Sequence, residues 1–167
     1  MPKVTPLPTG THDPHPDQAL YHQDEHAWIA AQVAALTNGR LNRLDRTNLI
    51  DYLTEMTIRD RRELRSRLVV LLLHLLQCQF QPGRLTRGWV TTILEQQSEI
   101  RSLLDSIPSL GRQADTLAAS AYPDAIRRAA RETGLPAARF PATSPWTVDA
   151  ARAFDPPEPA SRSSRHQ

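Results

Sequence analysis

The chain has 167 residues, of which 40% are hydrophobic and 5% aromatic, and its formal net charge at pH 7 is +2. A chain of this length predicts one domain, which can bury enough apolar surface to fold without a structural metal or a disulfide. The small net charge excludes the strong general attraction that basic proteins have for nucleic acids and anionic membranes.

The single cysteine, Cys78, cannot form an internal disulfide, which favours a reducing compartment. The first 16 residues, MPKVTPLPTGTHDPHP, contain five prolines and lack the apolar run of a signal peptide. We therefore expect a cytoplasmic protein with a disordered leader over residues 1–16. The end of the chain, PPEPASRSSRHQ, is equally poor in apolar residues, so we expect a helical domain over 17–155 and a disordered tail over 156–167.

Apolar residues at helical spacing predict a first helix over residues 17–38, with Gly39 as its stop. Asp45 is a suitable N-cap for a second helix. The apolar residues of that second helix are Leu49, Ile50, Leu53 and Met56. The pattern changes phase near residues 57–60, where Asp60-Arg-Arg-Glu63 has the form of a capping box that would restart a helix. The sequence leaves open whether this point is a break or a bend.

The central stretch Arg67–Phe80 reads RLVVLLLHLLQCQF, and from Leu68 to Leu76 only His74 is polar. A helix without a polar side must be surrounded by other elements. Its apolar run is too short to cross a membrane, which needs about 20 apolar residues. We therefore expect this stretch at the centre of a helical bundle, and no association with membranes.

Three more helical segments follow, up to Ser106, from Pro108 to Gly134, and after Thr147. Pro123 falls inside the second of them and should kink or divide it. No stretch shows the alternation of a strand. The sequence predicts an all-α, single-domain bundle of five or six helices around the central apolar helix.

Seven short motifs along these segments support a resemblance to a known protein family. They are Tyr21-x-x-Asp24-x-x-x-Trp28, Gly39-Arg40-Leu41-x-x-Leu44-Asp45, Asn48-Leu49-Ile50, Arg61-Arg62-Glu63-Leu64, Leu71-Leu72-Leu73-His74-Leu75-Leu76, Glu132-Thr133-Gly134-Leu135 and Phe140-Pro141. On these motifs the chain resembles the bacterial family called domain of unknown function 29, over about residues 21–154. The resemblance implies a helical fold and supplies no activity, substrate or cofactor. Gln77 stands where a lysine is common in that family, and Ser144 where a cysteine is frequent, so chemistry that required either residue should be absent here.

His74 is the first candidate for chemistry, because it is the one polar side chain in the apolar run. A buried imidazole beside a carboxylate can act as a general acid or base. The carboxylates that could serve are Glu95, Glu99 and Asp24. His74 and Cys78 are four residues apart, but two ligands do not make a metal site. A core histidine hydrogen-bonded to a facing polar group explains the same pattern, and we favour that interpretation, with no metal and no cofactor.

An arginine-rich segment, RDRRELRSR at residues 59–67, is the second candidate, and further arginines follow the central helix. The proposed binding residues are Arg61, Arg62, Arg65, Arg84, Arg87 and Trp89. Guanidinium groups bind phosphates, and an indole ring is a stacking surface for bases. Alternatively, these arginines form ion pairs with acids such as Asp60 and Glu63. The low net charge favours the ion pairs.

The sequence contains no Gly-rich phosphate loop, zinc signature or nucleophile elbow. We therefore expect a protein-binding adaptor or regulator rather than an enzyme, with a partner whose identity the sequence does not indicate. Two alternatives stay open. The first is nucleic-acid binding through the Arg59–Arg67 face, and the second is an enzyme that uses His74 with a carboxylate.

Overall fold

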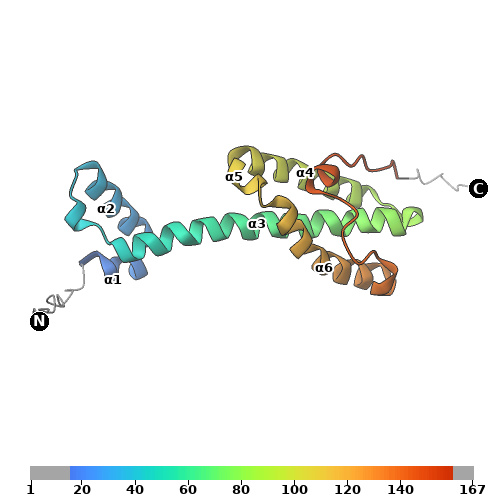
Figure 1. Cartoon of the computed structure of the whole chain (residues 1–167), viewed down its shortest axis with the longest axis horizontal. Helices are drawn as coiled ribbons and strands as arrows, with labels where there is room; N and C mark the ends of the chain where they lie inside the picture. The colour runs from blue at the N-terminus through green and yellow to red at the C-terminus, as the bar shows by residue number, and fades with distance from the viewer. Residues whose placement is uncertain (1–15, 160–167) are drawn as a thin grey trace, which may run out of the picture. The chain divides into compact units, whose positions relative to one another are not determined.

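The computed structural model describes residues 16–159 (Figure 1), and these residues form α-helices and short 3-10 turns without any strand. The predicted all-α class is therefore confirmed. The helices are α1 (Pro16–Gln23), α2 (Glu25–Thr37), α3 (Arg46–Phe80), α4 (Arg87–Ser106), α5 (Pro108–Gly111), α6 (Ala114–Thr133) and α7 (Val148–Arg152). The chain divides into two compact units, residues 1–57 and 58–167.

In the first unit, the single helix expected over residues 17–38 is interrupted at Asp24, so that prediction is wrong. The carboxylate of Asp24 accepts a hydrogen bond from the Ala27 N–H at 3.0 Å, which makes Asp24 the N-cap of α2. The backbone at Asp24 has φ −151° and ψ 89°, outside the helical region. An aspartate at this position therefore ends one helix and starts the next.

Asp45 is the buried polar centre of the first unit, with only 2% of its surface exposed. Its carboxylate accepts hydrogen bonds from the indole of Trp28 at 3.2 Å and from the side-chain amide of Asn48 at 2.6 Å. The Asn48 backbone N–H lies 3.3 Å from the same carboxylate, as expected for the cap of α3. The backbone N–H of Asp45 in turn donates to Gln32 at 2.8 Å. One carboxylate thus fixes both the start of α3 and the position of α2.

The expected change near residues 57–60 is not a break, because α3 is one helix of 35 residues from Arg46 to Phe80. The capping box predicted at Asp60–Glu63 does not form. Instead, Glu63 accepts hydrogen bonds from Arg67, one turn further along the same helix, at 2.8 and 3.0 Å. A Glu–Arg pair with this spacing stabilises a helix interior, so the same residues support continuity.

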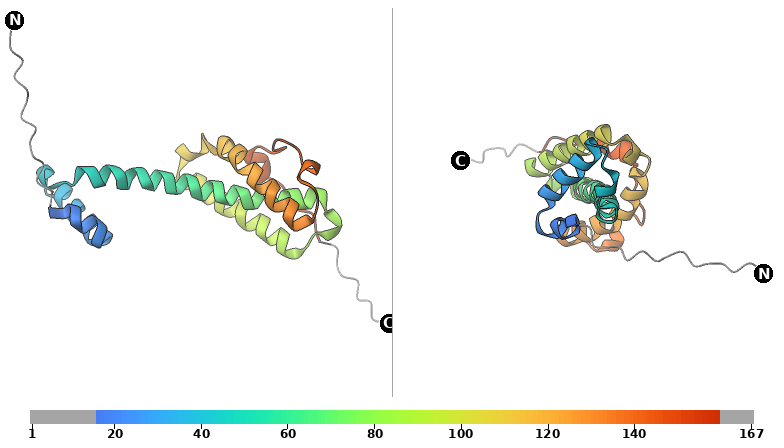
Figure 2. Two further views of the ribbon diagram at one scale, coloured as in Figure 1. Left: turned by 90° about the horizontal axis from the view of Figure 1, so that it is seen from below. Right: turned by 90° about the vertical axis from the view of Figure 1, so that its left-hand side faces the viewer.

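In the second unit, α4 and α6 lie along opposite sides of the C-terminal half of α3 (Figures 1 and 2), and the central stretch is buried as predicted. The fully buried leucines of α3 are Leu64, Leu68, Leu71, Leu72, Leu75 and Leu76. Helix α6 faces them largely with alanines, at positions 114, 118, 121, 125 and 129. Small side chains at this helical spacing let two helix backbones approach closely.

Pro123 does not divide α6, which runs unbroken from Ala114 to Thr133. The chain breaks earlier, between α5 and α6. Thr147 caps α7 as expected, accepting from the Ala150 N–H at 3.1 Å. The Gln97 amide of α4 then donates to the carbonyls of Ala151 and Phe154, at 3.0 and 2.7 Å, and so holds the C-terminal segment on the bundle.

The disordered leader expected at residues 1–16 lies outside the described residues except for Pro16, which begins α1. Of the tail expected at 156–167, only residues 156–159 are described, and they are not helical. Within residues 16–159, none of the helices has both the length and the apolar content needed to cross a membrane.

We expect Leu72→Ala to lower the free energy of unfolding by about 2–5 kcal/mol, because truncating a buried leucine leaves a cavity that its neighbours fill incompletely. The matched control is Leu94→Ala, since Leu94 is 52% exposed. This control should change the same free energy by less than about 0.5 kcal/mol. Urea denaturation followed by circular dichroism measures both. Equal losses in the two variants would contradict the packing described here.

Candidate functional site

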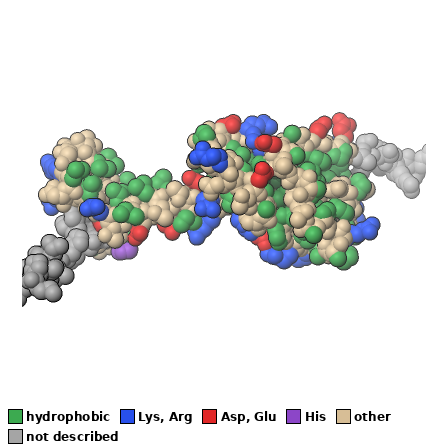
Figure 3. Space-filling model, in the orientation of Figure 1, with side chains coloured by type: hydrophobic (Ala, Val, Ile, Leu, Met, Phe, Trp, Pro, Cys, Tyr) green, Lys and Arg blue, Asp and Glu red, His purple; other side chains and the backbone are tan. Residues whose placement is uncertain are grey.

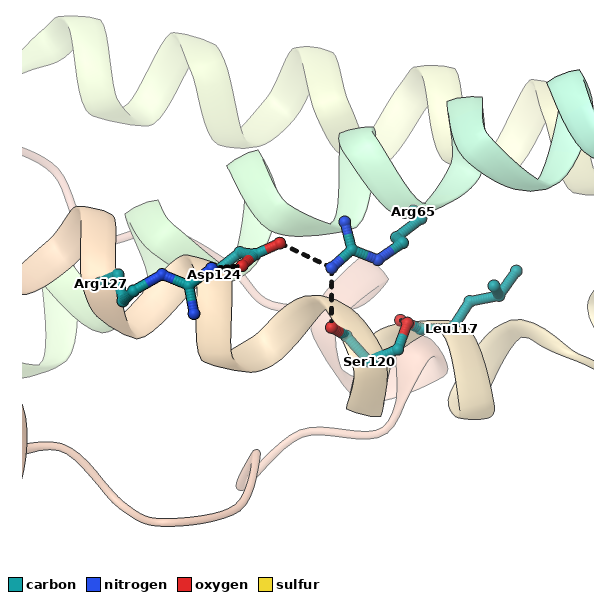
Figure 4. Close-up of polar contacts among 5 residues, drawn as sticks. All are labelled: Arg65, Leu117, Ser120, Asp124 and Arg127. Carbon is teal, nitrogen blue, oxygen red and sulfur yellow. Dashed lines mark hydrogen bonds and ion pairs between the residues drawn. The ribbon is translucent and has the colours of Figure 1, made fainter.

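Arg65 connects α3 to α6 through two hydrogen bonds (Figure 4). Its Nη2 donates to the carboxylate of Asp124 at 2.6 Å and to the backbone carbonyl of Ser120 at 2.9 Å. Pro123 has no N–H, so the turn of α6 that carries these acceptors makes fewer backbone hydrogen bonds than an ordinary helical turn. Asp124 also pairs with Arg127 of its own helix. The guanidinium of Arg65 is therefore held in one place by α6.

These arginines also set the charge of Asp124. The hydrogen bond from Arg65 is the largest cause that lowers the pKa of Asp124 below its ordinary value of 3.8, and the charges of Arg127, Arg65 and Arg128 act in the same direction. Partial desolvation opposes them. Asp124 is accordingly ionised at neutral pH, and it neutralises part of a surface that is otherwise rich in arginine.

A hollow of about 180 Å³ lies beside Arg65, and we call it the arginine-rimmed hollow. It is lined by Ile58, Arg61, Arg62, Arg65 and Leu117. Arg61 and Arg62 are exposed, and neither forms an ion pair with any residue in the described part of the chain. Three of the six predicted binding residues thus come together around an apolar floor.

The other three predicted binding residues are elsewhere. Arg84 ends the 3-10 turn Pro82–Arg84, Arg87 begins α4, and both are exposed. The Trp89 ring lies against His74, with 6.5 Å between the ring centroids. Arg84, Arg87 and Trp89 do not line the hollow, so the six residues predicted to bind are not gathered around it. Arg67 is also engaged, since it pairs with Glu63 and, at 3.2 Å, with Glu99.

The polar partner of His74 is Gln77 of its own helix, rather than a group that faces it from another helix. Nδ1 of His74 lies 2.7 Å from Oε1 of Gln77, and the Gln77 amide donates to Glu132 at 2.8 Å. An amide oxygen only accepts, so Nδ1 is the donor. His74 hydrogen-bonds to none of the carboxylates proposed for it. Glu95 and Glu99 are exposed on α4, and Asp24 is the N-cap of α2.

The sequence could not have revealed the second of these hydrogen bonds, because Glu132 is 55 residues from Gln77 and only the fold brings them together. Cys78 is buried, and desolvation raises the pKa of its thiol, which stays protonated at neutral pH. Within residues 16–159, no three His, Cys, Asp or Glu side chains are grouped so as to hold a metal ion.

A second surface belongs to the first unit, where large apolar side chains face solvent. We call it the apolar face, and its members are Val33, Leu36, Leu41, Ile50, Leu53 and Met56. Ile50, Leu53 and Met56 are 61%, 54% and 45% exposed, and they recur every third residue along α3. Figure 3 shows hydrophobic side chains gathered over α2 and the first part of α3. The sequence identified these helical apolar residues but gave no sign that they are left uncovered.

One family model matches the chain, over residues 20–155, and its description is Domain of unknown function DUF29. The matched region includes all of the motifs quoted above and both surfaces. No curated protein and no solved structure matches the chain. The match confirms the family resemblance, and the description of the family attaches no activity to it.

We expect Asp124→Asn to lower the melting temperature at neutral pH and to have progressively less effect in acid. The pKa of Asp124 is lower in the folded chain than its ordinary value of 3.8. Its stabilising contribution is therefore present above that value and is lost as the pH falls through the folded pKa. Thermal unfolding of both proteins from neutral pH to about pH 2 measures this effect. Asp105→Asn is the exposed control, and a difference for Asp124→Asn that stays constant with pH would contradict the assignment.

Proposed function

We propose that this chain, which belongs to the DUF29 family, acts by binding another protein through the apolar face of its first unit. One observation carries the proposal. Of the seven large hydrophobic side chains that are exposed in the described residues, six belong to this face, and Leu94 is the other. A concentration of exposed large apolar side chains in one part of a chain is the usual mark of a surface that another molecule covers.

The partner that fits this surface is an amphipathic helix of another protein. Residues 50, 53 and 56 of α3 form a broad stripe, since three residues advance a helix by a little less than one turn. A partner helix with apolar residues at the same spacing can lie along such a stripe. Full burial of a leucine or isoleucine contributes on the order of 1.5–3 kcal/mol before the entropy of association is subtracted, and covering these half-exposed side chains contributes a part of that. A few such residues are enough for a specific complex.

The two alternatives have less support. For an enzyme, His74 would need a catalytic partner and a reachable substrate, whereas its Nδ1 is bonded to Gln77. For nucleic-acid binding, Arg65 and Arg67 of the face at residues 59–67 are engaged with carboxylates. Arg61 and Arg62 are exposed, but no aromatic ring on which a base could stack lines the hollow beside them. We also place the protein in the cytoplasm, because its one cysteine is an unpaired, buried thiol.

The test replaces two exposed residues of the apolar face, Ile50 and Leu53, with glutamate. The double variant should keep the stability of the parent chain within about 1 kcal/mol, because neither side chain is buried. It should weaken the complex with a native partner by at least about tenfold. Leu94→Glu is the matched control and should leave the complex intact. The partner is captured from native lysate by a photo-reactive amino acid at position 53, identified by mass spectrometry and measured by calorimetry.

Three results would contradict the proposal. The first is the absence of any stoichiometric product cross-linked at position 53. The second is a partner whose affinity falls equally in the double variant and in Leu94→Glu. The third is a product that contains only a second copy of this chain, because the apolar face would then be a dimer interface rather than the surface of an adaptor.

A further inference from the structure

The arginine-rimmed hollow is a second surface whose chemistry can be specified. Its floor is apolar, made by Ile58 at the start of the second unit's part of α3 and by Leu117 of α6. The side chains of Arg61, Arg62 and Arg65 complete the lining, each of these residues carries a positive charge, and none of the lining residues is acidic. A ligand for this hollow must therefore combine negative charge with an apolar group.

The three arginines of the rim differ in how they are held. Arg65 is fixed by Asp124 and by the Ser120 carbonyl, so its orientation is set before any ligand arrives. Arg61 and Arg62 are exposed and make no ion pair within residues 16–159. Their charges are available to an incoming carboxylate, and arginine binds carboxylates with paired, charge-assisted hydrogen bonds.

The apolar floor makes this hollow unlike a site that binds nucleic acid. A surface that follows a phosphate backbone needs an extended row of positive charge, and single strands are bound by aromatic rings on which bases stack. No aromatic ring lines the hollow, and the carboxylates of Asp124 and Glu132 interrupt the arginines further along α6. A leucine or phenylalanine side chain flanked by acids fits the floor and the rim together.

We propose that the arginine-rimmed hollow binds an acidic segment of a partner protein, in which a leucine or phenylalanine is flanked by aspartate or glutamate. The apolar side chain rests on Ile58 and Leu117, and the flanking carboxylates pair with Arg61 and Arg62. This site shares no residue with the apolar face, and the proposal does not depend on that face. The chain then carries two surfaces of different chemistry, one apolar and one basic.

The experiment uses the full chain and a fluorescent peptide with the repeating sequence Glu-Asp-Leu-Glu-Asp-Phe, titrated by fluorescence anisotropy at physiological salt. We expect saturable binding. Replacing Arg61 and Arg62 together with glutamine should weaken it by about tenfold or more. The matched control removes the same charge at Arg84 and Arg87, which are exposed and do not line the hollow, and should change the affinity by less than about twofold.

Two further probes test whether the ligand needs an apolar side chain and whether the hollow prefers a peptide to DNA. A peptide in which glycine replaces leucine and phenylalanine should bind about tenfold less tightly, because it leaves the apolar floor exposed. A DNA duplex of about 20 base pairs should bind more weakly than the acidic peptide. Three results would overturn the proposal: no binding of the peptide, equal loss in the two arginine pairs, or tighter binding of the duplex that is abolished by the Arg61/Arg62 replacement. Unchanged circular dichroism spectra show that the variants are folded.

Discussion

The need to cover one helix on every side determines the second unit. Between Leu68 and Leu76 the helix α3 has almost no polar surface, so it is stable in water only when other elements surround it. Helices α4 and α6 supply that cover, and α6 approaches closely because alanines face the leucines. Polar side chains then fix these elements on α3. Arg65 of α3 donates to Asp124 of α6, and Gln97 of α4 donates to a carbonyl of the C-terminal segment. The packing of α3 against α6 also places Arg61, Arg62 and Arg65 beside Leu117 of α6.

The first unit is organised differently. A hydrogen-bond network around Asp45 lies at its buried centre, and several of its large apolar side chains are exposed to solvent. Asp45 satisfies the Trp28 indole and caps α3, which fixes the unit without a large apolar core. Ile50, Leu53 and Met56 are then free to serve a surface role. A protein that binds others needs such a surface, and the basic hollow of the second unit differs from it in chemistry. Two surfaces of different chemistry on one chain fit the role in protein binding that we propose.

Local patterns in the sequence predicted much of the fold. The apolar run predicted the buried helix, Asp45 and Thr147 predicted two caps, and the motifs predicted the family. The errors arose where one local signal competed with another. Asp24 lies inside the helix predicted over residues 17–38 but caps α2, whereas Asp60, predicted to restart a helix, lies inside the unbroken α3. The sites could not be predicted, because they combine residues that are far apart in the sequence. Leu117 lines the hollow with Arg61 and Arg62, and Gln77 bonds to Glu132, only when the helices pack. Apolar spacing alone also cannot show whether a helical stripe is covered.

The central claim, that the apolar face is a surface for a partner, is tested most directly by hydrogen exchange along α3. The exchange rate of each amide is measured in the isolated chain and in its complex with the partner that cross-linking identifies. We expect amides of residues 49–57 to exchange more slowly in the complex, because a partner helix restricts the opening of that part of α3. Amides of residues 68–76 should exchange at the same slow rate in both, since they are already buried. Protection gained only outside residues 33–57, with none on the first part of α3, would show that the partner does not bind at the apolar face.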